Sequence, residues 1–573
     1  MLADGERGAI LGPQGDIAWM CIPRWDDDAV FSSLLGGRGV YAVTPSERFV
    51  WGGYYEPGSL IWVNRWTTDT GIIECRDALA YPGESQRAVL LRRIVAREGA
   101  ATVDIVLDPR AHFGRTAMSQ VRRDGEVWTA RSGEIHLRWQ GAPEARRSTS
   151  RTQSGLRLTL ELGDGEHRDL VLELSDQELP DEPENAQAAW YATDTNWPAA
   201  VPAMPHALAP RQTRHSVAVL RGMTSSTGAM VAAATTSLPE RAEAGRNYDY
   251  RYAWIRDQCY AGIAAAKAGL DDLVRDAVRF VGARLRADGE QLMPAYTTAG
   301  GRIPEQHRVG LPGYPGGHDL IGNRVVGQFQ LDGFGEALQL FAEAARRGEL
   351  DGDGWRAAEI AADAIAARWR EPDAGIWEIE DRPWTHSRLT AAAGLRAIAA
   401  VADPPGPATS WIALADLIVA ETSATALHPD GYWQRSPDDA GLDGALLLVG
   451  LRGAVPADDP RTVATLEAYD RDLTQDGFAY RFRHDGRPLA HVEGSFLLCS
   501  FVMALARHQQ GDELAAHGWW ERSRAACGPS MLFSEEYDVE QHQMRGNLPQ
   551  AFVHAVMVET AVTLAPSTKP VEG

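Results

Sequence analysis

The chain has 573 residues, of which 44% are hydrophobic and 23% charged, and its formal net charge is −22. This length exceeds the roughly 250–300 residues at which a single hydrophobic core usually stops growing, so two domains are expected. The acidic balance argues against binding to nucleic acid or to an anionic membrane surface, because like charges would repel.

The cysteines and the N-terminal residues point to a reduced compartment. The five cysteines are scattered and form no Cys-x-x-Cys pair, so neither a zinc site nor a disulfide framework is predicted. The first residues lack the basic and apolar regions of a signal peptide, and no apolar stretch reaches the about 18 residues that a membrane span needs. We therefore expect a cytoplasmic protein that uses no metal and no cofactor.

The first third of the chain has the two-residue periodicity of β-strands. Leucines at every second position from Leu156 to Leu162 alternate with other residues, which turns one face of a strand inward. Turn-forming residues separate this run from similar ones, a pattern typical of antiparallel sheets. The pattern predicts an antiparallel β-sandwich over residues 1–180, followed by a proline-containing linker over residues 181–210.

From about residue 211 the apolar spacing changes to three and four, which is typical of helices. Leu331, Phe334 and Leu338 show this spacing on one helix face. About twelve segments share it. They lie near 212–222, 256–268, 271–287, 324–347, 353–370, 387–402, 408–427, 440–451, 460–473, 493–509, 511–526 and 549–565.

The connections between these segments alternate between short and long. Short loops join antiparallel neighbours, so every long loop is expected at the same end of the bundle. Residues 211–573 are therefore expected to close into a ring of helical hairpins, an (α/α)6 barrel. An open solenoid is the alternative, although no self-similar repeat of fixed period is visible. We expect a binding site among the long loops on one face.

The first long loop ends in residues 247–257, with the sequence Asn-Tyr-Asp-Tyr-Arg-Tyr-Ala-Trp-Ile-Arg-Asp. An arginine and an aspartate beside aromatic rings can hydrogen-bond the hydroxyls of a sugar while the rings cover its apolar surface. The alternative interpretation is an ion pair at a helix start, with Asp257 near the helix N-terminus.

Two later loops each carry a glutamate suited to acid–base chemistry. Glu378 directly follows Trp377, where desolvation favours the protonated form that a general acid requires. Glu535 lies in the last long loop. A barrel brings both to one face, where one carboxyl can protonate a departing glycosidic oxygen and the other can deprotonate water or attack the sugar. Each loop alone also fits a solvated acidic turn.

Several motifs follow one another along nearly the whole chain. They are residues 15–26, 235–240, 246–257, 321–332, 375–378, 493–499, 534–536 and 546–552. The series resembles glycoside hydrolase family 15, the glucoamylase-like family, in its bacterial and archaeal form. The resemblance implies a β-sandwich before an (α/α)6 barrel, and release of glucose from the non-reducing end of α-glucosides with inversion.

The resemblance also implies roles for single residues. By position, Glu378 matches the general acid and Glu535 matches the general base. Inversion requires these carboxyls to lie about 6.5–9.5 Å apart, with a water between them. The residues that it implies for substrate binding are Tyr250, Trp254, Arg256, Asp257, Trp377, Arg481 and Glu536.

The predicted function is that of an exo-acting, inverting glycoside hydrolase of the glucoamylase or α-glucosidase type, with an oligosaccharide or polysaccharide as substrate. A trehalase is the alternative, because some family members of that kind are similar in every motif. Two departures leave the leaving-group preference open: Glu380 stands where bacterial members often have a basic residue, and Glu536 stands where fungal relatives have glutamine. A non-catalytic sugar-binding protein and a phosphorolytic enzyme are further alternatives, and a homo-oligomer is left open.

Overall fold

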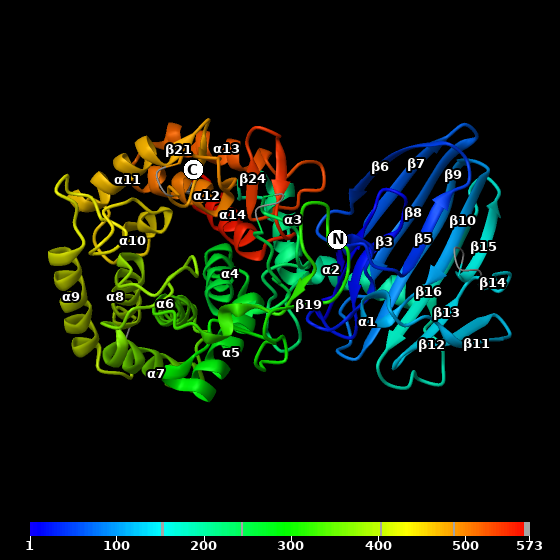
Figure 1. The fold of residues 1–573 in the computed structure, drawn as a ribbon, viewed down its shortest axis with the longest axis horizontal. Helices are drawn as coiled ribbons and strands as arrows, with labels where there is room; N and C mark the ends of the chain where they lie inside the picture. The colour runs from blue at the N-terminus through cyan, green and yellow to red at the C-terminus, as the bar shows by residue number, and fades with distance from the viewer. Residues whose placement is uncertain (150–153, 242–244, 402–403, 485–486, 567–573) are drawn as a thin grey trace, which may run out of the picture.

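Strands fill the first third of the chain and helices fill the rest, in two parts that lie side by side (Figure 1). The C-terminal residues 567–573, which the sequence assigns to the helical domain, lie outside the described residues. The arrangement is seen in a computed structural model that describes residues 1–149, 154–241, 245–401, 404–484 and 487–566.

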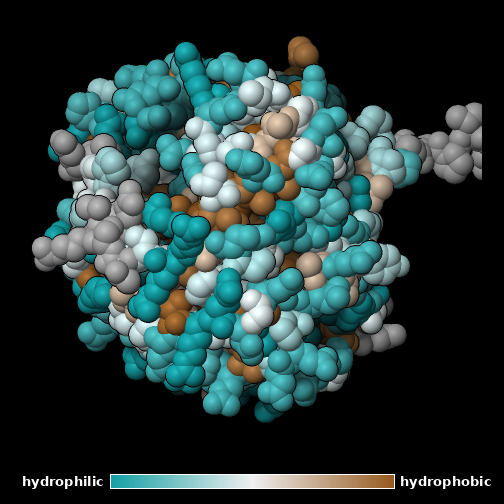
Figure 2. Space-filling model, turned by 90° about the vertical axis from the view of Figure 1, so that its right-hand side faces the viewer, coloured by the Kyte–Doolittle hydropathy of each residue, from teal (hydrophilic) through white to brown (hydrophobic). Residues whose placement is uncertain are grey.

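The N-terminal part consists of three antiparallel sheets. The largest has eight strands in the order β11-β12-β13-β16-β9-β8-β7-β6, and the two smaller ones have the orders β14-β15-β10-β5 and β1-β2-β3-β4. On β15 the predicted alternation is present, because Leu156 and Leu160 are buried whereas Thr159 and Glu161 are exposed. The face of this part that points away from the helices is mostly hydrophilic, with apolar side chains visible between the polar ones (Figure 2).

The elements of this part are short and closely spaced. Their bounds are β1 Leu2–Ala3, β2 Gly8–Leu11, β3 Ile17–Cys21, β4 Ala29–Phe31, β5 Val40–Pro45, β6 Phe49–Tyr55, β7 Trp62–Thr68, β8 Gly71–Leu79, β9 Arg87–Gly99, β10 Ala101–Asp108, α1 Ala111–Gly114, β11 Ser119–Asp124, β12 Val127–Ser132, β13 Ile135–Gln140, β14 Arg146–Thr149, β15 Ser154–Leu162 and β16 His167–Ser175. Together with the helices that follow, they confirm the predicted fold class.

The stretch predicted as a linker contains a helix, α2 (Ala186–Ala200). Its N-terminus is capped by Asn185, whose side chain accepts a hydrogen bond from the amide of Ala188 at 2.9 Å. One face of α2 is buried against the large sheet through Trp190, and the guanidinium of Arg76 lies 4.4 Å from the centroid of that ring. The helix could not be predicted from this acidic, proline-containing stretch, because few residues form the apolar face of α2.

Replacing Trp190 is expected to destabilise the β part strongly. Trp190→Ala removes a side chain that is 2% exposed, so the free energy of unfolding should fall by about 3–5 kcal/mol. Tyr191 on the same helix is 74% exposed, and Tyr191→Ala should change stability by no more than about 0.5 kcal/mol. Urea unfolding followed by circular dichroism measures both variants. Equal effects would show that α2 does not pack as described.

The helical part is a closed double ring. Within the described residues, the inner helices α4, α6, α8, α10, α12 and α14 contact one another in that order, and α14 returns to α4. This closure rules out the open solenoid. The helix bounds are α3 Pro210–Gly222, α4 Ile255–Ala268, α5 Asp271–Asp288, α6 Asp332–Arg346, α7 Gly352–Arg368, α8 Thr385–Ala399, α9 Ala408–Thr425, α10 Leu448–Leu451, α11 Pro460–Asp472, α12 Leu497–Gln509, α13 Glu513–Ala525 and α14 Ala551–Thr563.

Two inner helices begin later than the sequence pattern predicts. The segments from 324 and from 440 first form short 3₁₀ turns, Arg324–Gly327 and Gly444–Leu447. Each turn is started by a polar side chain that accepts an amide hydrogen bond: Asn323 from Val325, and Asp443 from Ala445. These local hydrogen bonds compete with the α-helix.

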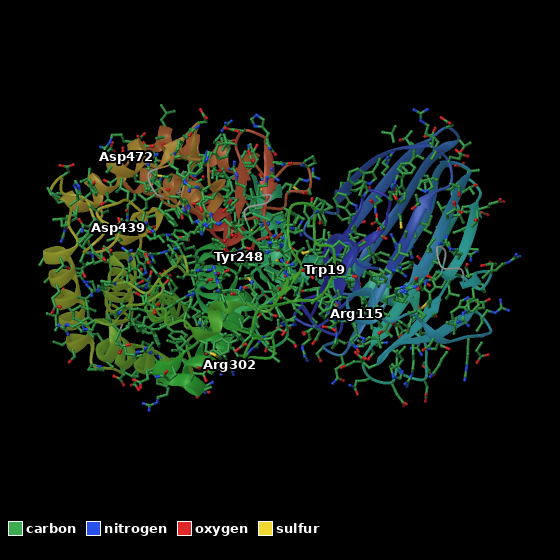
Figure 3. All side chains as sticks on the ribbon, viewed as in Figure 1. Trp19, Arg115, Tyr248, Arg302, Asp439 and Asp472 are labelled. Carbon is green, nitrogen blue, oxygen red and sulfur yellow. The ribbon has the colours of Figure 1, made fainter. Side chains whose placement is uncertain are left out.

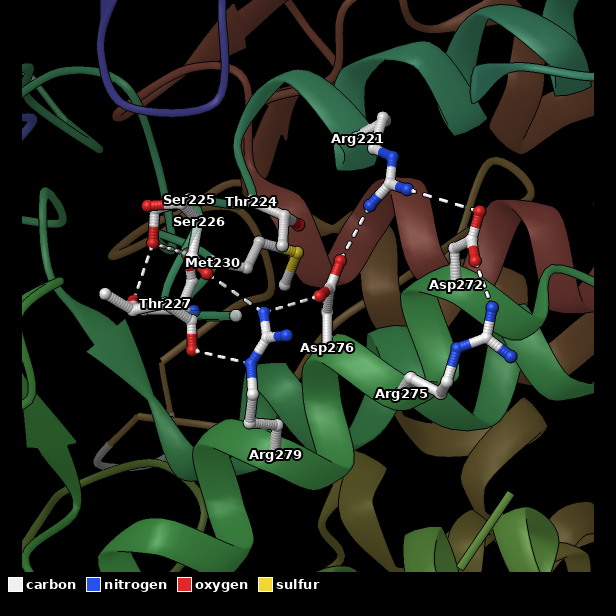
Figure 4. A network of polar contacts seen from close by, with 12 residues as sticks. Arg221, Thr224, Ser225, Ser226, Thr227, Met230, Asp272, Arg275, Asp276 and Arg279 are labelled. Atoms are coloured by element: carbon white, nitrogen blue, oxygen red, sulfur yellow. Dashed lines mark hydrogen bonds and ion pairs between the residues drawn. The ribbon is translucent and has the colours of Figure 1, made fainter. Parts of the chain in front are cut away.

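An ion pair attaches the end of α3 to the outer helix α5, and a hydrogen bond attaches the loop after α3 to the same helix (Figure 4). Asp276 accepts from Arg221 and from Arg279, each at 2.7 Å. Arg279 also donates to the backbone carbonyl of Ser226 at 3.0 Å. The amide of Ser226 in turn donates to the side chain of Glu6 at 2.7 Å, so this loop links the barrel to the N-terminal strands.

The loop between β3 and β4 contacts the segment that precedes α4. Arg251 donates to the carbonyl of Asp27 at 2.7 Å and to Asp249 at 2.9 Å, and both Arg251 and Asp249 are buried. The guanidinium lies 5.7 Å from the ring centroid of Trp19, which is labelled where the two parts meet in Figure 3. The β part therefore supports the loop that carries the predicted sugar-binding residues.

Apart from the 3₁₀ turn Ser33–Leu35 of the β part, the remaining short elements lie in the connections of the helical part. Among the described residues, no helix combines the length and apolar character needed to cross a membrane. The five cysteines are all buried and free. The bounds of the short strands are β17 Ala253–Trp254, β18 Ala295–Tyr296, β19 His307–Arg308, β20 Leu320–Ile321, β21 Thr474–Gln475, β22 Phe478–Ala479, β23 Ser495–Phe496, β24 Glu536–Asp538 and β25 Gln543–Arg545; the other 3₁₀ turns are Ser33–Leu35 and Gly289–Gln291.

Candidate active site

A pocket lies among the long loops of the barrel. Its residues come from the start of α4, from the α7–α8 loop, from the segment between α11 and α12, from the position before β24 and from the start of α14. The predicted residues that line it are Tyr250, Trp254, Arg256, Asp257, Trp377, Glu378, Arg481 and Glu535. The barrel thus brings together side chains from distant parts of the sequence.

Glu378 is held at the end of a tight turn. Its backbone has a φ of 56°, a left-handed conformation that costs a non-glycine residue about 1–3 kcal/mol and therefore depends on support from its surroundings. Its amide donates to the carbonyl of Gly375 at 3.1 Å. Its Oε1 accepts from the indole of Trp254 at 2.6 Å and lies 3.5 Å from the guanidinium of Arg256. The side chain stays 24% exposed, so one carboxyl oxygen can face a ligand.

Glu535 is more enclosed. It is 6% exposed, and its Oε2 accepts from the hydroxyl of Tyr250 at 2.9 Å. Burial raises the pKa of Glu535 to about 8, with a further upward contribution from the charge of Glu240, while Arg481 acts in the opposite direction. The carboxyl therefore holds a proton more strongly than an ordinary glutamate does.

An aromatic pair spans the space between the two carboxyls. Tyr250 donates to Glu535, and Trp254, four residues later, donates to Glu378. The two rings meet edge to face with centroids 5.8 Å apart. The short segment 250–254 therefore fixes both carboxyls in one pocket, which agrees with the sequence-based expectation that they share a face.

Arg256 and Asp257 form the pair that the sequence pattern suggested. Arg256 donates to Asp257 Oδ1 at 2.8 Å and to the carbonyl of Ile376 at 2.6 Å. Asp257 lies in the first turn of α4, as the helix-start interpretation requires. Its Oδ2, however, is buried without a hydrogen-bond partner in the described part of the chain, and burial raises its pKa. Asp257 therefore keeps one unused acceptor oxygen at the wall of the pocket.

Trp377 and Arg481 form another wall of the pocket. The indole of Trp377 donates to Asp443 at 2.6 Å, which fixes the ring. Arg481 donates to Glu493 and lies 4.5 Å from the ring centroid of Phe496. Both side chains are oriented by partners behind the pocket, so they present fixed surfaces to a ligand.

Glu536 is not among the described residues that line the pocket, and its substrate-binding role stays a prediction. Its side chain is fully buried and accepts from the amide of Gly494 at 2.8 Å. Glu536 begins β24, and successive side chains of an extended chain point to opposite sides. Glu536 Oε1 lies 3.9 Å from the guanidinium of Arg481, so Glu536 sits behind this pocket-lining residue while its Oε2 holds the amide of Gly494, just before β23.

Sequence reasoning missed three residues of the site. Gln550 and Phe552, at the start of α14, line the pocket, and Gln550 Oε1 is buried without a partner among the described residues. Glu240 lies behind Tyr250, with 3.4 Å between its Oε1 and the tyrosine hydroxyl. All three fall inside motifs that the sequence analysis noted, at 546–552 and 235–240, but the motifs alone did not show which side chains face the pocket.

Comparisons with known proteins agree with this geometry. The family profile described as "Glycosyl hydrolases family 15" matches residues 215–562, and the one described as "Trehalase-like, N-terminal" matches residues 1–159. The chain is similar to the trehalase of Mycobacterium tuberculosis, with 31% identity over 98% of this chain and 88% of that protein. It is also similar to the isomaltose glucohydrolase of Kribbella flavida, with 29% identity over 60% of this chain and 83% of that protein.

A solved structure shares the fold along nearly the whole chain. It is a bacterial glucoamylase complexed with acarbose, with a TM-score of 0.67 and 13% identity. The match covers 98% of this chain and 94% of that one. At this identity the likeness shows the fold, a β-sheet domain followed by a helical barrel.

Proposed function

The chain belongs to glycosyl hydrolase family 15, and from this premise we propose that it is a trehalase, which hydrolyses the bond between the two glucose units of α,α-trehalose. The N-terminal match supports this choice, because its description is that of a trehalase-like domain. The relative from Mycobacterium tuberculosis supports it further, since that protein is named a trehalase and is similar over both parts of the chain. The alternative stated from the sequence is therefore better supported than the glucoamylase interpretation.

Glu378 is proposed as the general acid. Its carboxyl is the more exposed of the two candidate catalytic groups, and the indole of Trp254 fixes one of its oxygens. The other oxygen is then free to give a proton to the glycosidic oxygen as the bond to the anomeric carbon breaks. Arg256, at 3.5 Å, stabilises the carboxylate that this transfer leaves behind.

Glu535 is proposed as the general base. It takes a proton from a water molecule while the water oxygen attacks the anomeric carbon from the face opposite the leaving group. Its raised pKa supports this role, because a base is most effective when its pKa lies near the working pH. The base must be ionised, so kcat/KM is expected to rise with pH through a range above that of an ordinary glutamate.

The Arg256–Asp257 pair is proposed to hold the glucose unit that is attacked. The unpaired Oδ2 of Asp257 and the unpaired Oε1 of Gln550 are buried acceptors for sugar hydroxyls. An acceptor of this kind discriminates strongly between sugars with and without the matching hydroxyl, because a sugar that lacks it leaves the buried acceptor without a hydrogen bond.

The cellular setting is proposed to be the cytoplasm. The five cysteines are all free and buried, and a reducing compartment keeps thiols in this state. Trehalose hydrolysis in that compartment would supply glucose directly to reactions that consume the free sugar.

A substrate panel tests the proposal. The full chain is incubated with trehalose, isomaltose and maltose, and glucose release is followed for each. We expect kcat/KM for trehalose to exceed the other values by about tenfold or more, because the chain is similar to trehalases over both of its parts. The three sugars share the glucose unit that is attacked, so this preference would depend on how the departing unit fits. The runner-up is an α-glucosidase that acts on short oligosaccharides, favoured by the similarity to the Kribbella flavida enzyme. Glucose from isomaltose with none from trehalose would establish the runner-up instead.

A further inference from the structure

A tyrosine hydroxyl lies between two buried carboxyls. Tyr250 Oη is 2.9 Å from Glu535 Oε2 and 3.4 Å from Glu240 Oε1. Glu240 is 5% exposed, and its Oε2 has no hydrogen-bond partner in the described residues, although Arg246 approaches it to 3.6 Å. The roles argued above leave this side chain without a function.

The chemistry of a phenol limits how these three groups can bond. A tyrosine hydroxyl has one hydrogen, so it can donate to only one of the two carboxyls at a time. The other carboxyl can bond to the phenol oxygen only if it carries a proton and donates it. Two anionic carboxylates at these positions would also repel each other in a buried site. The geometry therefore favours one proton for the pair.

The other charged groups near Glu240 come from three segments. On its own segment Arg246 attracts a negative charge, and Tyr248 is neutral. From the segment before α12, Arg481 is attractive and Glu493 repulsive. From β24, Glu536 is repulsive toward both carboxyls of the pair. Glu493 is compensated by its ion pairs with Arg481, Arg246 and His484, and one oxygen of Glu536 accepts from the amide of Gly494. Glu240 differs from both because the hydroxyl of Tyr250 links it to Glu535.

We propose that Glu240 and Glu535 share one proton across the hydroxyl of Tyr250, so that Glu240 sets the pH range in which Glu535 can accept a proton from water. Glu240 is then a positioning residue: it touches neither water nor sugar and acts through Tyr250. When Glu240 holds the proton, it donates to the phenol oxygen, the phenol donates to Glu535, and Glu535 is the ionised base. This inference rests on the proposed role of Glu535.

The test is the pH dependence of kcat/KM for Glu240→Gln. In the wild type the shared proton rests mainly on Glu535, whose pKa is raised to about 8 by burial and by the charge of Glu240. Glutamine keeps a donor to Tyr250 but carries no negative charge, so Glu535 ionises more readily. The acidic limb of the profile is expected to move to lower pH by about one unit or more. α-D-Glucosyl fluoride is the substrate, because fluoride leaves with little help from an acid and the limb then reports the base. A limb that stays in place would overturn the proposal.

A matched control removes one carboxylate from the β24–β25 hairpin, which directly follows Glu535. Glu540 is exposed and follows Glu535 by a few residues, so Glu540→Gln should leave the limb where it is. A shift in this control equal to that of Glu240→Gln would mean that any lost charge moves the limb, and would overturn the specific role of Glu240. Melting temperatures of the variants show whether each one folds.

A double substitution tests whether the hydroxyl of Tyr250 links Glu240 to Glu535. In the Tyr250→Phe background no hydroxyl links the two carboxyls, so adding Glu240→Gln should shift the limb by less than half as much. A shift of the same size as in the wild-type background would show that Tyr250 does not link the two carboxyls, and would overturn the proposal. The test does not depend on the natural substrate: wild-type protein that cleaves the fluoride but not trehalose would refute the trehalase proposal alone.

Discussion

Glu378→Gln is expected to lower kcat/KM for trehalose by about 100- to 10,000-fold, the usual contribution of a general acid. Glutamine keeps the size of the side chain and can still meet the indole of Trp254, but it cannot protonate the glycosidic oxygen. Since Glu378 is 24% exposed, the loss of its charge should not unfold the loop. Steady-state kinetics on trehalose, with a melting temperature for each variant, measure the effect.

A second substrate separates a lost acid from a damaged pocket. Hydrolysis of α-D-glucosyl fluoride should fall by no more than about tenfold in Glu378→Gln, because the leaving group needs little protonation. Glu380→Gln is the control: this side chain is two residues away and 61% exposed, and it pairs with Arg382. Equal losses on both substrates would show that Glu378 does not act as the acid.

Glu535→Ala is expected to lower kcat/KM by about 100- to 10,000-fold on trehalose and on the fluoride alike, because both reactions need a base to activate water. The variant also opens space beside Tyr250 where the carboxyl had been. Azide, a nucleophile that needs no base, should then enter this space and restore the consumption of the fluoride. The product would be β-glucosyl azide, since attack comes from the face opposite the departing fluoride.

The azide product identifies the side of the sugar on which Glu535 lies. Proton NMR distinguishes the two anomers of glucosyl azide. Glu378→Gln serves as the comparison and should show no such rescue, because its base is intact. An α-configured azide product would place Glu535 on the leaving-group side and contradict the assignment.

Most of the helical architecture could be predicted from the sequence. Apolar residues at a spacing of three and four, such as Leu331, Phe334 and Leu338, mark buried helix faces directly. The alternation of short and long connections then places the long loops at one end, and with them Glu378 and Glu535. The helix α2 was not predicted, because its burial depends on partners such as Arg76, which lies far away in the sequence.

The orientation of single side chains was harder to predict. Glu535 and Glu536 are neighbours of the same type, and the sequence suggested that both serve the site. Only the strand geometry of β24 shows that one faces the pocket while the other supports Gly494. Glu240 could not be found either, because its contact with Tyr250 depends on how the loop before α4 folds back on itself.

The stereochemistry of trehalose hydrolysis tests the central claim most directly: that Glu378 and Glu535 act from opposite faces of one glucose unit. Proton NMR can follow the wild-type reaction before the glucose anomers equilibrate. Inversion at the attacked carbon gives one β-glucose, and the departing unit remains α-glucose, so the account predicts equal amounts of both at the earliest times. α-Glucose as the sole early product would mean retention and would contradict the account.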